Sequence, residues 1–351
     1  MKRSVVGLSA TLLLAIALAA CGGESETPDE PAARVGAAPV EEGAFPVEIE
    51  HEYGSTTIDD EPDRIVVVGL KEQDDLLALG IVPVATTTWF DDTPGSIYAW
   101  AEDELGDAET PVSLSSDDGV EFERVAALEP DLILGLYAGL SKSDYETLSD
   151  IAPTVAQPAG LPDYGIGWQK ELLTVGKAVG RPEAAQDIVD DVTARFAKVA
   201  ENHPEFEGKT ALFATRYDGT YVYGSADPRS RLLTDLGFEL PANIDQVVGT
   251  KDFGANISAE RTDFLDTDVL VWLTNVKDDK DTILDDKVYT SLPVHENGRD
   301  IFVGDAGDKE YGFSISFVTA LSIPYTLDRL VPQLAAAVDG DPATEVPVPE
   351  D

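Results

Sequence analysis

Few residues of this 351-residue chain are of the types that bind metals or carry out covalent chemistry. The three histidines, His51, His203 and His295, are widely separated in the sequence. Neither they nor the one cysteine form a spaced set of metal ligands, so we expect no metal bound directly by side chains and no cofactor. The chain lacks the G-x-S-x-G, P-loop and G-x-G-x-x-G motifs, which argues against an enzyme. A glycosidase-type pair of carboxylates stays open, because acidic residues are so frequent.

The only cysteine, Cys21, directly follows an apolar stretch that runs from Val5 to Ala20. Two basic residues precede this stretch, and the whole pattern is typical of a secretory signal. Residues 18–21 (LAAC) resemble a bacterial lipobox, which implies that residues 1–20 are removed and that Cys21 is lipidated. Two or three acyl chains on one residue give stable membrane anchoring. An ordinary signal peptide with a chance cysteine is the alternative.

The formal net charge of −43 comes from 67 acidic and 24 basic residues. Nucleic acid is not an expected partner, because phosphate binding depends on cationic side chains. So acidic a surface favours solubility, particularly in a salty medium that screens the repulsion between its charges. No second apolar run of membrane-spanning length follows the first, so the body of the chain is expected outside the membrane.

The rest of the chain alternates between short helical and extended patterns. Residues 21–44 contain the cysteine and a polar stretch rich in proline, glycine and alanine, which predicts a lipidated, flexible acidic linker. Residues 45–58 predict a pair of strands around a glycine turn. Strands are predicted at 64–69 and 82–87, with a helix at 72–80 between them. Such alternation predicts parallel sheets covered by helices.

The second half repeats this pattern, because LLTDLGFELPA (232–242) echoes LLALGIVPVA (76–85). Related lobes or convergence of simple βα units would explain the echo. Between the halves, residues 182–202 carry apolar residues at helical spacing, and a helix of this length spans ~30 Å. We therefore predict an α/β fold of two βα lobes with mainly parallel central sheets, joined by one long rigid helix beside a ligand cleft. The predicted parts are a first lobe (45–181), the connecting helix (182–202), a second lobe (203–335) and an acidic tail containing proline (336–351).

Several segments together resemble the substrate-binding proteins of bacterial ABC transporters, of the type that binds iron–siderophore complexes. These segments are PDRIVVVGLKEQDDLLALGIVPVA, LEPDLILG, IAPTV, LLTDLGF, ISAERTDFLDTDVLVW and GRDIFVG, and the resemblance covers roughly residues 45–335. It implies capture of a ferric siderophore in the cleft and its delivery to an ABC permease with its ATPase. The iron would arrive as a complete chelate. The expected protein is a monomer, held by its lipid on the outer face of the bacterial cytoplasmic membrane.

Siderophores are bulky chelators, so their binding site needs aromatic walls and a few polar or cationic contacts. Loops that follow the ends of parallel strands face the cleft in this architecture. Arg216 is the favoured cation, because a guanidinium offers several donors to ligand oxygens and arginine is scarce here. The aromatic candidates are Trp89, Phe90, Tyr98, Trp100, Tyr137, Tyr217, Trp272 and Tyr311. Core packing is the alternative for each ring.

The resemblance also implies that one acidic side chain on each lobe docks to the permease. Glu146, five residues before an Ile-Ala-Pro sequence, matches the first-lobe pattern, and Glu260 is the candidate in the second lobe. Cobalamin or haem remain alternative ligands of the same scaffold. A hydrolase or a structural lipoprotein anchored at the surface are the other classes left open. The sequence does not choose between hydroxamate, catecholate and citrate chelates.

Overall fold

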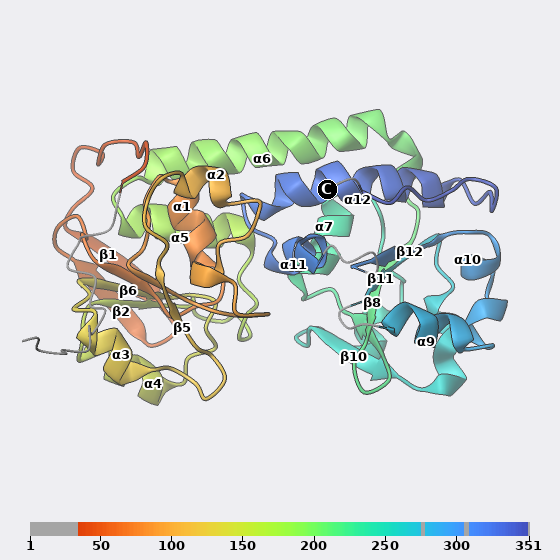
Figure 1. The fold of residues 1–351 in the computed structure, drawn as a ribbon, viewed down its shortest axis with the longest axis horizontal. Coiled ribbons are helices and arrows are strands. Elements are labelled where there is room, and N and C mark those ends of the chain that lie inside the picture. The colour runs from red at the N-terminus through yellow and green to blue at the C-terminus, as the bar shows by residue number, and fades with distance from the viewer. Residues whose placement is uncertain (1–33, 275–277, 305–308, 350–351) are drawn as a thin grey trace, which may run out of the picture.

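The computed structural model describes residues 34–349, except 275–277 and 305–308, and consists of two α/β lobes side by side (Figure 1). The predicted signal peptide, Cys21 and the first part of the predicted linker lie outside the described residues. In the described part of the chain, no helix combines the length and the apolar character needed to cross a membrane.

The first lobe contains a five-stranded sheet in which all neighbouring strands are parallel, with the order β5-β4-β3-β6-β7. Its strands are β3 (Ile65–Val67), β4 (Ala85–Thr87), β5 (Val112–Leu114), β6 (Leu132–Gly135) and β7 (Thr154–Ala156). Its helices are α1 (Glu72–Ala78), η1 (Pro94–Ser96), α2 (Glu102–Leu105), α3 (Phe122–Ala127), α4 (Lys142–Ser149) and α5 (Trp168–Ala178). The predicted strand pair is the antiparallel hairpin of β1 (Val47–His51) and β2 (Gly54–Ile58).

The second lobe contains a mixed five-stranded sheet with the order β10-β9-β8-β11-β12. Its strands are β8 (Ala211–Arg216), β9 (Thr220–Tyr223), β10 (Gly254–Ile257), β11 (Val269–Leu273) and β12 (Asp300–Val303). Strands β8, β11 and β12 are parallel, whereas β9 is antiparallel to both β8 and β10. The β8–β9 connection is a tight turn in which Asp218 and Gly219 have positive φ angles, so β9 reverses direction at once.

The remaining helices surround this second sheet and link the lobes. They are α6 (Pro182–Asn202), η2 (Pro204–Phe206), α7 (Pro228–Asp235), α8 (Ile244–Val247), η3 (Ala259–Leu265), α9 (Asp279–Asp285), η4 (Tyr289–Ser291), α10 (Pro293–Glu296), α11 (Lys309–Phe317) and α12 (Ser322–Val338). The predicted α/β architecture of two lobes with mostly parallel sheets is confirmed. Helix α12 ends at Val338, so it continues past residue 336, where the tail was predicted to begin.

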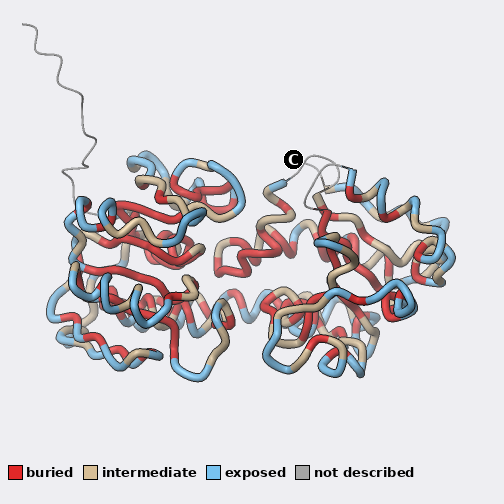
Figure 2. Tube along the Cα trace, turned by 90° about the horizontal axis from the view of Figure 1, so that it is seen from below, coloured by how far each residue is buried: buried red, intermediate tan, exposed pale blue. Residues whose placement is uncertain are grey.

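The central strands of both sheets, such as β3, β6 and β11, are buried on both faces, as their continuous apolar sequences require. In β3, Ile65 and Val67 face one core, and Val66 faces the core on the opposite side of the sheet. In β8, Phe213 faces one core and Leu212 faces the core on the opposite side of the second sheet. One apolar cluster contains residues of both sheets together with α5, α6 and α12, so it is continuous through both lobes. Figure 2 shows buried segments inside each lobe and along the helices that join them.

Helix α6 is the only long element that runs along both lobes among the described residues, and it occupies one edge of the molecule (Figure 1). It packs closely against α5, because a Cβ atom on Gly176 would lie only 2.4 Å from the Cβ of Ala185. The Glu41 carboxylate accepts a hydrogen bond of 2.7 Å from the backbone N–H of Glu183 and so caps the first turn of α6. Residues 34–44 of the predicted linker therefore lie against the first lobe.

Aromatic side chains of the two lobes pack against each other at the boundary between the lobes. Phe317 of α11 is fully buried and contacts Trp89, Tyr98 and Trp100 of the first lobe, with ring centroids 5.1–5.3 Å apart. A hydrogen bond adds to this contact, since Thr319 Oγ1 donates to Asp74 Oδ2 at 2.6 Å. The two lobes are thus joined by packed side chains as well as by α6.

Candidate ligand-binding site

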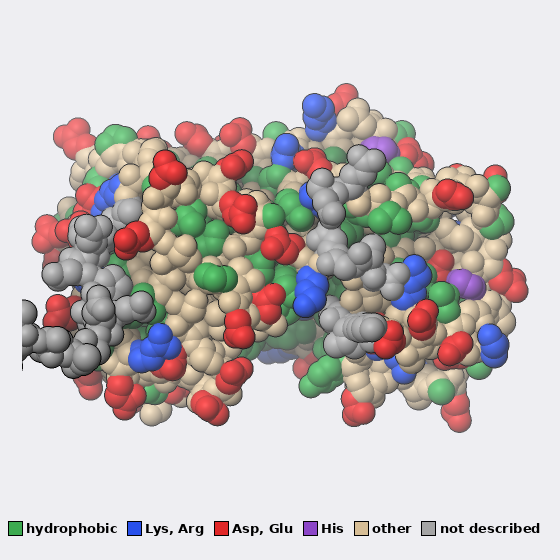
Figure 3. Space-filling view, viewed as in Figure 1, with side chains coloured by type: hydrophobic (Ala, Val, Ile, Leu, Met, Phe, Trp, Pro, Cys, Tyr) green, Lys and Arg blue, Asp and Glu red, His purple; other side chains and the backbone are tan. Residues whose placement is uncertain are grey.

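A cavity of about 530 Å³ lies between the two lobes, large enough for a compact organic ligand. The first lobe lines it with residues that follow β3, β4, β5 and β6, where the carboxyl ends of parallel strands meet. The second lobe contributes residues of β9, the start of α7 and the segment before β10. Figure 3 shows acidic side chains over both lobes and a notch between the lobes on the side away from α6.

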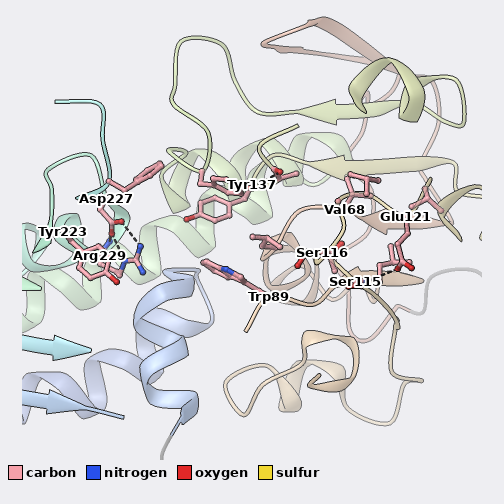
Figure 4. A pocket seen from close by; sticks show the side chains of 18 of the residues that line it. Val68, Trp89, Ser115, Ser116, Glu121, Tyr137, Tyr223, Asp227 and Arg229 are labelled. Carbon is pink, nitrogen blue, oxygen red and sulfur yellow. Dashed lines mark hydrogen bonds and ion pairs between the residues drawn. The ribbon is translucent and has the colours of Figure 1, made fainter. Parts of the chain in front are cut away.

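Aromatic side chains from both lobes line this cavity. They are Trp89, Tyr137 and Tyr164 of the first lobe, and Tyr221, Tyr223 and Phe253 of the second. The Tyr137 ring is 5.8 Å from the Trp89 ring and 5.2 Å from the Tyr164 ring, measured between centroids. In Figure 4, Tyr137 and Trp89 lie between the rest of the first-lobe wall and the Arg229–Asp227 pair. Such walls suit a large, partly apolar ligand.

Buried polar groups hold Tyr137 in this position. Its backbone N–H donates to Glu72 Oε1 at 2.9 Å, and Lys71 Nζ lies 4.2 Å from the centre of its ring. Lys71 Nζ also forms a buried ion pair of 2.9 Å with Glu171 of α5. The Glu72 side chain needs glycine at position 69, because a Cβ on Gly69 would lie 2.0 Å from Glu72 Oε1. The position of Tyr137 is therefore fixed by residues at the start of α1.

Arg229 is the one basic residue in the described lining of the cavity. It lies in the first turn of α7, where Asp227 is the N-cap and accepts from the backbone N–H of Arg229 at 2.8 Å. The two side chains pair through two contacts, with Nε 2.8 Å from Oδ1 and Nη2 2.7 Å from Oδ2. The guanidinium also lies over the Tyr223 ring at 4.1 Å. Burial alone would lower the pKa of Arg229, but Asp227 raises it, so the charge is retained.

These features can be compared with known proteins. A family model described as periplasmic binding protein matches residues 65–306, which is more than half of the chain. The chain belongs to the periplasmic binding protein family. A solved periplasmic solute binding protein from Mycobacterium smegmatis is 35% identical to this binding protein, with a TM-score of 0.73, over 83% of this chain and 98% of that one.

Two further relatives of this binding protein carry more specific names. PiaA of Streptococcus pneumoniae TIGR4, solved in complex with ferrichrome, is 27% identical with a TM-score of 0.71, over 84% of this chain and 99% of that one. YhfQ of Bacillus subtilis, provisionally named an ABC transporter substrate-binding lipoprotein, is 27% identical over 291 residues, 80% of this chain and 82% of that protein. Other relatives are named for binding ferric siderophores or ferric citrate. The family consists of substrate-binding proteins for transport.

The structure places the predicted contacts of this binding protein in different environments. Trp89 and Tyr137 line the cavity. Phe90 stacks between Trp89 and Phe313, at 4.4 and 4.5 Å, outside the lining. Arg216 ends β8 and Tyr217 is exposed in the turn after it, and neither lines the cavity.

The other four predicted aromatic residues are buried. Tyr98 and Trp100 belong to the packing between the lobes, and Trp100 Nε1 donates to Asp74 at 2.8 Å. Trp272 is in the core of the second lobe and donates to the Tyr289 hydroxyl at 2.9 Å. Tyr311 is buried on α11, where its hydroxyl donates to Gln333 at 2.7 Å. Direct ligand contact by these residues stays a prediction.

The sequence analysis did not identify the second-lobe side of the cavity, formed by Tyr221, Tyr223, Asp227, Arg229 and Phe253. Two local signals for it exist. The Asp218-Gly219 pair between alternating residues is typical of a hairpin, and Asp227-Pro228 is typical of a helix start. Together these signals place β9 and the first turn of α7 in sequence immediately after β8.

Buried acids make the stability of this protein depend on pH. Burial raises the pKa of Asp74 to about 7, and hydrogen bonds from Thr319 and Trp100 offset only part of that effect. Burial also raises the pKa of Glu171, despite its pairing with Lys71. Because carboxyls in the unfolded chain titrate near pH 4, the folded state binds more protons between about pH 4 and 7, and stability falls as pH rises through that window.

We therefore expect the melting temperature to rise when the pH is lowered from 8 to 5.5. In Asp74→Asn, which keeps an acceptor for Thr319 and Trp100, the rise should be smaller, as measured by calorimetry at matched ionic strength. The exposed Asp187→Asn serves as the control for lowered surface charge. Equal pH dependence in the Asp74 variant and the wild type would contradict this account of Asp74.

Proposed function

We propose that this binding protein captures a ferric siderophore outside the cytoplasmic membrane and delivers it to an ABC permease with its ATPase. The cavity between the lobes, walled by aromatic rings and containing the Arg229–Asp227 pair, is the observation that carries the proposal. The complex of PiaA with ferrichrome supports the same ligand class. It favours a ferric siderophore over cobalamin or haem.

In this proposal iron enters as a complete chelate, and the protein does not catalyse a reaction. The described lining offers rings, hydroxyl groups, one guanidinium and the carboxylates of Glu121 and Asp227, and includes neither histidine nor cysteine. Among the described residues, no group of three or more potential ligands is placed to hold a metal ion. The siderophore itself would supply the iron ligands, and the protein would act as a monomer.

The test is fluorescence titration of the full chain in mild detergent, because Trp89 lies in the cavity wall. We expect saturable quenching by at least one ferric siderophore with a dissociation constant below ~1 µM, and none by cobalamin or haem. The same siderophore without iron is the matched control and should bind more weakly. Saturable binding of haem alone, or of no compound tested, would contradict the proposal.

Docking to the permease is proposed to use Glu146 and Glu260. Both side chains are exposed, Glu146 on α4 and Glu260 on η3. Helix α4 lies on the opposite side of the molecule from α6 (Figure 1), and the one ion pair of Glu146 with a described residue is an exposed contact of 3.5 Å with Lys142. Such an exposed pair contributes little to stability, so Glu146 is available to a partner.

Charge reversal tests this docking. In cells that carry the matching permease, Glu146→Lys is expected to lower uptake of radioactive ferric siderophore about tenfold or more. The reason is that lysine would repel the basic permease group that Glu146 is proposed to attract. Siderophore affinity should not change. Asp187→Lys, an equal charge reversal on the exposed side of α6, is the control and should leave uptake unchanged. Normal uptake by Glu146→Lys would remove Glu146 from the docking surface.

The lipid anchor is proposed to be attached to Cys21, in line with the lipoprotein name of YhfQ. In Cys21→Ser we expect most of the protein to move from the membrane fraction to the soluble fraction, because the acyl chains provide the anchoring energy. Immunoblots of both fractions measure this, and metabolic labelling with a palmitate analogue should be lost as well. Unchanged membrane association of the variant would indicate a different anchor.

A further inference from the structure

The charges around the cavity indicate which ferric chelates it accepts, an inference that rests on the proposed function. The described lining contains three charged side chains, the basic Arg229 and the acidic Asp227 and Glu121. The lining therefore has a formal net charge of −1. Names of relatives do not settle the chelate class, since they include ferrichrome and ferric citrate.

Asp227 already neutralises Arg229. Asp227 is fully buried and makes two contacts with the guanidinium, so both of its oxygens are occupied by that one partner. Arg229 can still donate hydrogen bonds to neutral ligand oxygens, but the pair as a whole carries no net charge. A ligand with several negative charges would meet the Asp227 carboxylate beside its only cationic contact in the described lining.

Two of the cations behind the lining are paired with acids, and a third donates to a backbone carbonyl. Lys71 is bound to Glu171 and is separated from the cavity by the Tyr137 ring. Arg124 lies 2.7 Å from Glu121. Arg231 Nη2 donates to the carbonyl oxygen of Gly165 at 3.4 Å. Burial raises the pKa of Asp235, and the positive charge of Arg231 offsets part of that rise.

The rest of the protein opposes anionic ligands as well. The chain has a net charge of −43, and acidic side chains are scattered over both lobes on the face drawn in Figure 3. The faces of the six aromatic rings carry partial negative charge, which favours cationic groups and disfavours anionic ones. The charges of the cavity lining, of the residues behind it and of the protein surface therefore all disfavour anionic ligands.

From these observations we infer that the cavity selects ferric tris-hydroxamates of zero or positive charge over anionic ferric catecholates and citrates. In a tris-hydroxamate, three singly charged groups neutralise Fe³⁺, so the chelate enters without a net negative charge. Its hydroxamate oxygens accept hydrogen bonds from Arg229, and its carbon backbone packs against the rings. A trianionic catecholate would instead leave buried negative charge without cationic partners, which is costly.

Titration of the full chain in mild detergent with four ferric chelates tests the inference. The probes are ferrichrome (neutral), ferrioxamine B (cationic), ferric dicitrate and a ferric tris-catecholate (both anionic). We expect the first two to bind at least ~100-fold more tightly than the last two, and only ferrioxamine B to weaken clearly as salt is raised from 50 to 500 mM. An anionic chelate that binds as tightly as ferrichrome would overturn the inference while leaving the proposed function intact. Failure of all four to bind would overturn both.

A single substitution in the cavity lining tests directly whether charge causes this selectivity. Glu121→Gln removes one negative charge from the lining and frees Arg124, and the partly exposed position should tolerate the change. Affinity for the anionic chelates is expected to rise about three- to tenfold relative to the affinity for ferrichrome. Glu123→Gln, an exposed position in α3 outside the described lining, two residues after Glu121, is the matched control and should not change the relative affinities. No gain for anionic chelates in Glu121→Gln would contradict selection by charge.

Discussion

Replacement of Arg229 by methionine is expected to weaken binding of a ferric hydroxamate by roughly 10- to 150-fold. A hydrogen bond from a charged donor contributes ~1.5–3 kcal/mol, and in this variant the donor is lost from the cavity. The remaining Asp227 carboxylate would also be buried without its partner and would repel the oxygen atoms of the ligand. Fluorescence titration measures the affinity, and calorimetry measures the accompanying loss of stability.

Two variants separate binding from folding in this prediction. Arg229→Met combined with Asp227→Asn removes the unpaired charge, so it should recover stability while affinity stays low. Arg216→Met changes the arginine favoured by sequence, which ends β8 outside the lining, and should leave affinity within about twofold of the wild type. If Arg216→Met abolished binding and Arg229→Met did not, the assignment of the cavity would be wrong.

Truncation of Phe317 to alanine is expected to lower the free energy of unfolding by ~3–5 kcal/mol. This fully buried ring contacts Trp89, Tyr98 and Trp100 across the boundary between the lobes, so its loss leaves a void there. A fall in melting temperature of about 10 °C is expected for a protein of this size. Because Trp89 also lines the cavity, siderophore affinity should fall with it.

Phe206→Ala is the matched control for this variant. Phe206 is also fully buried, but it packs within the second lobe, against Phe238 at 4.6 Å. We expect a similar loss of stability without a change in affinity, and an increased radius of gyration by small-angle X-ray scattering only in Phe317→Ala. Equal affinity and equal radius of gyration in the two variants would show that Phe317 does not fix the lobes relative to each other.

The first lobe shows how far the sequence predicts the site. Each apolar strand there is followed by a helical crossover, so parallel strands bring their carboxyl ends together. Residues that follow those ends, including Trp89 and Tyr137, could therefore be assigned to the cleft side by position alone. Tyr98 and Trp100 follow β4, as Trp89 does, but they pack against Phe317, more than 200 residues later in the chain. Local sequence cannot predict such a contact.

The second lobe differs because one connection is a turn instead of a helix. The tight Asp218-Gly219 turn makes β9 antiparallel to β8, so the cavity is lined by Tyr221, Tyr223 and the start of α7 instead of Arg216. Helix α1 falls within the helix predicted at 72–80, but the full burial of its N-cap Lys71 and of Asp74 was not predicted. Their partners, Glu171 and Thr319, come from distant segments, so only the folded structure identifies them.

Under the proposed function, the cavity between the lobes holds the iron chelate. Anomalous diffraction at the iron edge, from crystals of the protein grown with ferrichrome, locates the iron atom directly. We expect one strong anomalous peak in the cavity, between Tyr137 and Trp89 of the first lobe and Arg229 of the second, with chelate density against these side chains. An iron peak elsewhere on the protein, with the cavity empty of chelate, would contradict it.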